Sequence, residues 1–272
     1  MLKSALKHTC MFVIRSEQIG ALGMPAFERE MVQHIARYFP ERFLMMEEPA
    51  AMEVVRMSIA RCAEHNVEAR RDVCLFLNCA LVLGSGFASD PKFSWAAELL
   101  AMSGTKDASE RMTAVRDRML RQTEVFHVEI DDGLVQRLTR IQQSAREIAG
   151  SGASSTGIDI TRHLSTHCPE DVACFEPKDV VAFGDYAANK ATEHGFSAAQ
   201  DRSTFARLLF LLGAECDTDP QFHWIGSMLR QKPTSGVDER MELVLAETII
   251  RMQKAMALVS TLTKEYDEQG SE

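Results

Sequence analysis

Histidine and cysteine side chains gather near residue 165 of this 272-residue chain, and they are the first candidates for chemistry. His163 and His167 are four residues apart, which places both on one face of a helix, and Cys168 and Cys174 follow them. Two ligands at this spacing can share a zinc ion. The stretch has no HExxH glutamate and no CxxC pair, and the repeat described below keeps only one of the two histidines. We therefore predict no metal ligands or cofactor here, and a zinc site is the weaker alternative.

Alternating carboxylates in the segment ECDTDP resemble part of a calcium-binding loop. They are Glu215, Asp217 and Asp219, and the segment lacks the sixth-position glycine and twelfth-position glutamate of an EF-hand. Asp219 precedes a proline and an apolar run, which is typical of a helix N-cap. The segment is therefore predicted to be structural.

Two adjacent Glu-His pairs, Glu64-His65 and Glu193-His194, have the residue types of an acid/base couple. Adjacent helix residues point in different directions, however, and a histidine in the last turn of a helix is stabilised by the helix dipole. We favour the structural role. No other motif makes a specific case for catalysis, and the sequence predicts that the protein is not an enzyme and has no catalytic residues.

The seven cysteines are an odd number without a CxxC motif, and several lie inside apolar runs such as CLFLNCALVL. This usage predicts reduced, buried thiols in a cytoplasmic protein. No apolar run reaches the length of a membrane-spanning helix, so membrane insertion is not expected.

Charge is unevenly distributed along the chain. Residues 1–150 carry 19 Lys/Arg and 20 Asp/Glu, whereas residues 151–272 carry 11 and 19, within a formal net charge of −9. An acidic second half repels a phosphate backbone, so nucleic-acid binding is not expected. The acidity is first explained as a solvated face that aids solubility, and as the alternative it suits a basic protein partner.

The elements that position these residues occur twice. When residues 34–120 are shifted by 129 positions onto 163–249, 21 of 87 residues are identical, against about five by chance. The motif DPxFxW occurs in both copies, at 90–95 and 219–224, and contains the only two tryptophans of the chain. The sequence therefore predicts two tandem copies of one module.

Both copies have the same predicted series of helices. An amphipathic helix is followed by a helix that is apolar on nearly every side and ends at Gly84 or Gly213. Asp90 and Asp219 then cap a further helix. The predicted fold class is all-α, with two packed helical units and a long helix at roughly 238–266. The segment MFVIRSEQ is the one plausible strand.

The predicted domain organisation follows from the repeat. The first unit spans 1–150, a Ser/Gly-rich linker spans 151–157, and the second unit spans 158–272. An amphipathic helix over 131–148, with Leu134, Leu138, Ile141 and Ile148 inward, is assigned to the first unit.

Three stretches in order, RSEQIGALG, FEREMVQHIARYFPE and the ARRD…LG…DPKFSWAAELL run, cover mainly residues 13–100. They resemble uncharacterised all-helical bacterial proteins encoded beside type VI secretion spike and effector genes. Neighbours of this kind are commonly immunity proteins, chaperones or adaptors. The resemblance implies a binding role and supplies no site residues.

The function expected from the sequence is a cytoplasmic, non-catalytic protein-protein interaction module for a toxin or effector encoded nearby. Two alternatives stay open. One is an enzyme of an unfamiliar helical class that uses His163, His167 or the Glu-His pairs. The other is a structural homo-oligomer in which the long C-terminal helix pairs with itself.

Overall fold

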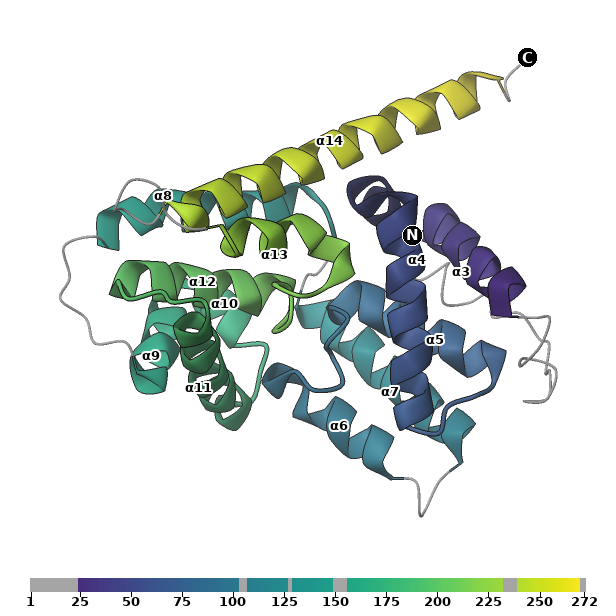
Figure 1. Ribbon diagram of the computed structural model, residues 1–272, viewed down its shortest axis with the longest axis horizontal. Helices are drawn as coiled ribbons and strands as arrows, with labels where there is room; N and C mark the ends of the chain where they lie inside the picture. Colours follow the sequence, from purple (N-terminus) through teal and green to yellow (C-terminus); the bar gives the residue numbers. More distant parts are fainter. Residues whose placement is uncertain (1–23, 103–106, 127–128, 149–155, 232–238, 270–272) are drawn as a thin grey trace.

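The computed structural model describes residues 24–102, 107–126, 129–148, 156–231 and 239–269. Every regular element within these ranges is a helix, which confirms the all-α prediction (Figure 1). The predicted extended segment MFVIRSEQ lies outside the described residues, as does most of the predicted linker.

The helices follow one another with short connections. In chain order they are α3 (Met24–Tyr38), α4 (Pro40–Glu64), α5 (Arg70–Leu83), η1 (Pro91–Phe93), α6 (Ser94–Ala101), α7 (Ala108–Val125), α8 (Asp132–Ile148), α9 (Gly157–His167), α10 (Pro169–Val172), α11 (Pro177–Glu193), α12 (Ala199–Leu212), η2 (Pro220–Phe222), α13 (His223–Leu229) and α14 (Arg240–Gln269). Figure 1 shows α3 to α7 on one side of the molecule and α9 to α13 on the other, with α14 lying across the top.

Helices α5 and α12 form the centre, as their all-round apolar sequences predict. Nearly every residue of α5 from Val73 to Leu83 is buried, and so is every residue of α12 from Thr204 to Leu212. Each helix ends at a glycine with positive φ, +98° at Gly84 and +111° at Gly213. Only glycine adopts this conformation readily, so the predicted helix stops are confirmed.

The loops that follow these glycines exchange hydrogen bonds across the molecule. The Ser85 backbone N–H donates to Asp219 (2.8 Å), and the Ala214 backbone N–H donates to Asp90 (3.0 Å). Asp90 and Asp219 also accept the N–H of the second residue of η1 and η2, which confirms the predicted caps. Each aspartate therefore caps the short helix after its own loop and also accepts a hydrogen bond from the backbone of the other loop.

The two sides of the molecule share one core. η1 packs against α11 and η2 against α4, so each side inserts a short helix into the other. A single cluster of buried side chains runs from Phe27 in α3 to Ala255 in α14.

Helix α8 packs against α12 and α14, although the sequence assigned it to the first unit (Figure 1). Leu134, Leu138 and Ile141 are buried in this contact, as expected from their spacing. The end of the predicted linker is also helical, because Gly157 is the first residue of α9.

Candidate binding sites

His163 and His167 lie side by side on α9, with ring centroids 4.2 Å apart. Burial, together with the charges of His167 and Arg207, lowers the pKa of His163 to about 4. Among the described residues, no three histidine, cysteine or acidic side chains converge in a way that could hold a metal ion.

The three carboxylates of ECDTDP point to different partners. Glu215 pairs with Arg61 of α4 (2.6 Å), and Asp217 pairs with Lys190 of α11 (2.7 Å). Asp219 is buried, which raises its pKa against the effect of hydrogen bonds from the Ser85 loop. The three carboxylates thus join the loop to separate parts of the protein rather than form a calcium loop.

The two histidines of the Glu-His pairs cap their helices, at the C-terminal ends of α4 and α11. His194 also contacts Asp217 through Nε2 (2.8 Å), whereas the position matching Asp217 in the first half is Ala88, so His65 has no such carboxylate. The two pairs therefore share a place in the fold but have different surroundings.

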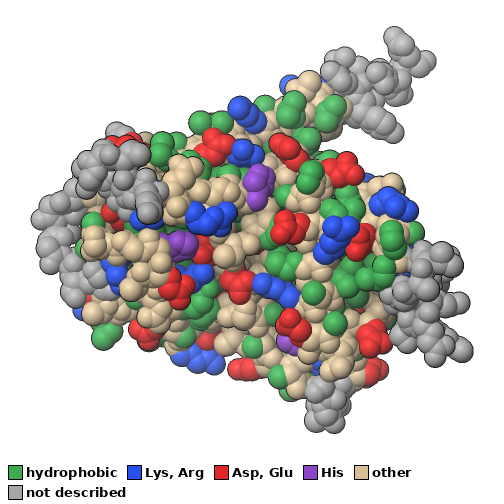
Figure 2. All heavy atoms as spheres, in the orientation of Figure 1, with side chains coloured by type: hydrophobic (Ala, Val, Ile, Leu, Met, Phe, Trp, Pro, Cys, Tyr) green, Lys and Arg blue, Asp and Glu red, His purple; other side chains and the backbone are tan. Residues whose placement is uncertain are grey.

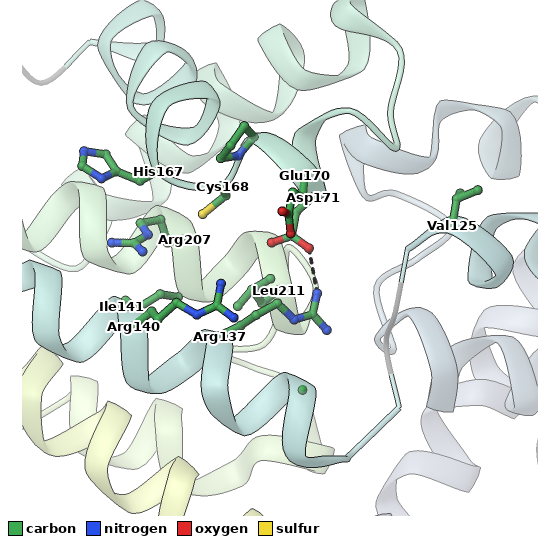
Figure 3. Close-up of a pocket in the computed structure, with 12 residues that line it drawn as sticks. Val125, Arg137, Arg140, Ile141, His167, Cys168, Glu170, Asp171, Arg207 and Leu211 are labelled. Carbon is green, nitrogen blue, oxygen red and sulfur yellow. Dashed lines mark hydrogen bonds and ion pairs between the residues drawn. The ribbon is translucent and has the colours of Figure 1, made fainter.

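A pocket of about 460 Å³ opens between α8, α12 and the chain from His167 to Asp171. Figure 3 shows Arg207 of α12 and Arg140 and Arg137 of α8 facing the segment that carries Cys168 and Asp171. Arg137 donates to Asp171 (2.7 Å). Arg207 is only 3% exposed, and its Nη1 donates to Ser144 Oγ (2.6 Å). The pocket therefore brings together two guanidinium groups from α8 and one from α12.

The thiol of Cys168 lines the same pocket. Burial raises its pKa although Arg207 acts in the opposite direction, so the thiol is protonated at neutral pH. Free thiols are also found at the other five cysteines that the structure describes: Cys62, Cys74, Cys79, Cys174 and Cys216. Cys62, Cys79 and Cys216 are buried as predicted, whereas Cys74 and Cys174 are only half-buried.

The second candidate surface is the C-terminal part of α14. Figure 1 shows that this part extends past α4, beyond the body of the molecule. Along α14 the large apolar side chains of Leu243, Ile250, Leu258 and Leu262 are 43–57% exposed. Figure 2 shows hydrophobic side chains along the same edge, and charges of both signs interspersed over the rest of that face.

The three pocket arginines were not among the functional residues predicted from the sequence. One signal was present, since Arg207 lies inside the apolar run FARLLFLL, at the position that a shift of 129 residues matches with Asn78. A charged residue in a helix that is otherwise buried on all sides needs a specific reason. Arg137 and Arg140 stand at exposed or half-exposed positions of an amphipathic helix and carry no such signal.

No helix in the described part of the chain is both long and apolar enough to cross a lipid bilayer. No protein-family model, no curated protein and no solved structure matches this chain.

Proposed function

We propose that this protein is a non-catalytic binding module, built from two copies of one helical unit, that holds a protein partner in the cytoplasm. The partner that the sequence resemblance favours is a toxin or type VI secretion effector encoded nearby, with the protein acting as its immunity protein, chaperone or adaptor. The observation that carries the binding role is the uncovered apolar face of α14.

Equivalent contacts 129 residues apart support the duplicated architecture. Arg111 at the start of α7 donates to the carbonyls of Leu100 and His65, at 2.5 and 2.9 Å. Arg240 at the start of α14 donates to those of Leu229 and His194, at 2.8 and 3.1 Å. In each half an arginine at the matching position donates hydrogen bonds to the matching two helix ends. Two copies of one unit would be expected to retain such contacts.

The buried face of α14 continues past the body that covers it. Val244, Thr248, Met252 and Ala255 are all 3% exposed or less and follow helical spacing. The next residues on this face are Val259 and Leu262, of which Leu262 is 57% exposed. Leu258, one turn before Leu262, is 53% exposed. Contiguous exposed apolar side chains of this kind mark interaction surfaces.

The occupant that fits this face is an amphipathic helix of the partner protein. Inside the body, helices α4, α8 and α13 pack against α14. A further helix would extend that packing without a change of geometry, and it would bury Leu258 and Leu262. Pairing of α14 with a second copy of this chain is the competing arrangement.

Binding to the purified product of the neighbouring gene tests this proposal. We expect a complex of sub-micromolar affinity by calorimetry, and we expect the double variant Leu258→Glu/Leu262→Glu to weaken it at least tenfold. Leu243→Glu is the matched control, because Leu243 is 51% exposed on the same helix but lies away from this end. Light scattering on the protein without a partner measures its oligomeric state and so tests whether α14 pairs with a second copy.

A wild-type protein that binds no neighbouring product contradicts the proposed function. A dimer that the double variant dissociates would instead assign the α14 face to self-association. Equal weakening by Leu243→Glu and by the double variant would show that the C-terminal part of α14 is not the binding surface.

A further inference from the structure

The pocket between α8 and α12 contains two guanidinium groups, of Arg140 and Arg207, that have no acidic partner among the residues that the structure describes. Arg207 is buried, and its Nε has no hydrogen-bond partner in the part of the chain that the structure describes. Within the described part of the chain, neither Arg207 nor Arg140 forms an ion pair, whereas Arg137 is matched by Asp171. Burying a guanidinium away from water is costly unless an opposite charge accompanies it. A ligand anion would supply that charge.

In the first half, the positions that correspond to His163, Arg207 and Cys168 are occupied by His34, Asn78 and Phe39. His34 there bonds to Asn78 Oδ1 through its Nε2 (2.8 Å), and Phe39 is buried where the second half has Cys168. In the second half Arg207 replaces the asparagine, and the Nε2 of His163 is buried with no hydrogen-bond partner among the described residues. The pocket therefore lies where the second half differs from the first at these positions and where α8 packs against α12.

The charge balance favours an anion with two negative charges. The C-terminal end of α9 adjoins the pocket and offers about half a negative charge, which is less than the two guanidinium charges. Glu170 also lines the pocket, but it is exposed to solvent and pairs with neither arginine. A phosphate monoester carries about −1.5 to −2 charges at neutral pH, and guanidinium forks match its oxygens.

The walls and the size of the pocket indicate a ligand that is larger than an inorganic ion. Ile141, Leu211 and Pro169 line it beside the arginines, and its volume of about 460 Å³ is in the range of small-molecule sites. We propose that the pocket binds a small organic phosphate, with Arg140 and Arg207 holding the phosphate group and the apolar side chains contacting the organic part. This site is separate from the α14 face.

Calorimetric titration of the full-length protein with phenyl phosphate tests the proposal, at constant ionic strength and pH 7.5. Inorganic phosphate and succinate are titrated in parallel. We expect phenyl phosphate to bind one equivalent, inorganic phosphate to bind more weakly because it lacks the apolar part, and succinate to bind the weakest of the three.

Two variants assign the binding to the pocket. Arg140→Gln changes an exposed side chain and leaves the core intact, and Arg207→Asn restores the residue type that the first half has at this position. We expect each to weaken phenyl phosphate binding by about tenfold or more, as for the loss of a hydrogen bond between charged groups. Arg121→Gln, at an exposed position of α7, is the control and should bind as the wild type does.

Three results would overturn the proposal. One is a wild-type protein that binds no phenyl phosphate at millimolar concentration. Another is binding that Arg140→Gln leaves unchanged, because Arg140 would then not hold the phosphate group. The third is tighter binding of succinate than of either phosphate, which would make the ligand a dicarboxylate.

Discussion

Gly84 and Gly213 lie back to back where the two central loops cross, so that a Cβ atom on Gly84 would be 3.3 Å from the Cα atom of Gly213. The relation is mutual, since a Cβ atom on Gly213 would be 3.2 Å from the Leu83 carbonyl oxygen. Both glycines also have positive φ. The crossing therefore depends on glycine for backbone conformation and for space.

Alanine at either position is expected to lower the free energy of unfolding by roughly 1–3 kcal/mol, because it combines an unfavourable φ with close contact. Gly195→Ala is the control. Gly195 also has positive φ (+73°), but no atom lies within 4 Å of the added Cβ, so only the conformational cost of about 1 kcal/mol applies. Urea unfolding of the three variants measures the difference, and equal losses would show that the close approach is not limiting.

The Asp90–Lys92 pair is fully buried at the same crossing, with 2.9 Å between its charged atoms. Lys92 also lies over the ring of Phe183, 4.7 Å from its centroid. We expect Lys92→Met to destabilise the protein by about 3–5 kcal/mol, because it leaves the Asp90 carboxylate buried without a cation. The double variant Lys92→Met/Asp90→Asn should recover part of this loss.

An exposed ion pair provides the comparison for Lys92. Arg56 pairs with Glu28 at 3.0 Å, and the Arg56 side chain is 64% exposed. Thermal and urea unfolding of Arg56→Met should differ from the wild type by less than about 1 kcal/mol. A loss at Lys92 no larger than at Arg56 would contradict the role given to burial.

Acid should destabilise the protein partly through His163. Its pKa in the folded protein is about 4, below its ordinary value of 6.5, so the unfolded chain binds a proton more readily than the folded one. This contribution to stability is fully present above pH 6.5 and is lost as the pH falls towards 4. His163→Asn should therefore lose less stability than the wild type between pH 6.5 and 4 in melting experiments. Parallel losses in the two proteins would contradict this assignment.

Arg111 and Arg240 should make comparable contributions to stability. Each joins two helix ends through charged hydrogen bonds to backbone carbonyls, so replacement by methionine should cost about 1.5–3 kcal/mol at either position. Chemical denaturation of the single variants measures both losses. A cost at one position only would argue against equivalent roles in the two halves.

Several of the helices and their ends could be predicted from the sequence alone. Caps at Asp90 and Asp219, glycine stops at Gly84 and Gly213 and the all-round apolar pattern of α5 and α12 are local features, because they depend on residues within a few positions of one another. Those predictions agree with the structure. The 129-residue offset was also visible in the sequence, and the duplication inferred from it stays a proposal.

Which side chains contact one another could be learned from the tertiary structure alone. Arg140 of α8, Arg207 of α12 and Cys168 after α9 are far apart in the chain and line one pocket because α8 packs against α12. The packing of α8 could not be predicted, because an apolar stripe by itself does not specify which helices it packs against. The physical reason is that helix formation follows from local sequence, whereas the choice of partner depends on shape and charge contributed by distant segments.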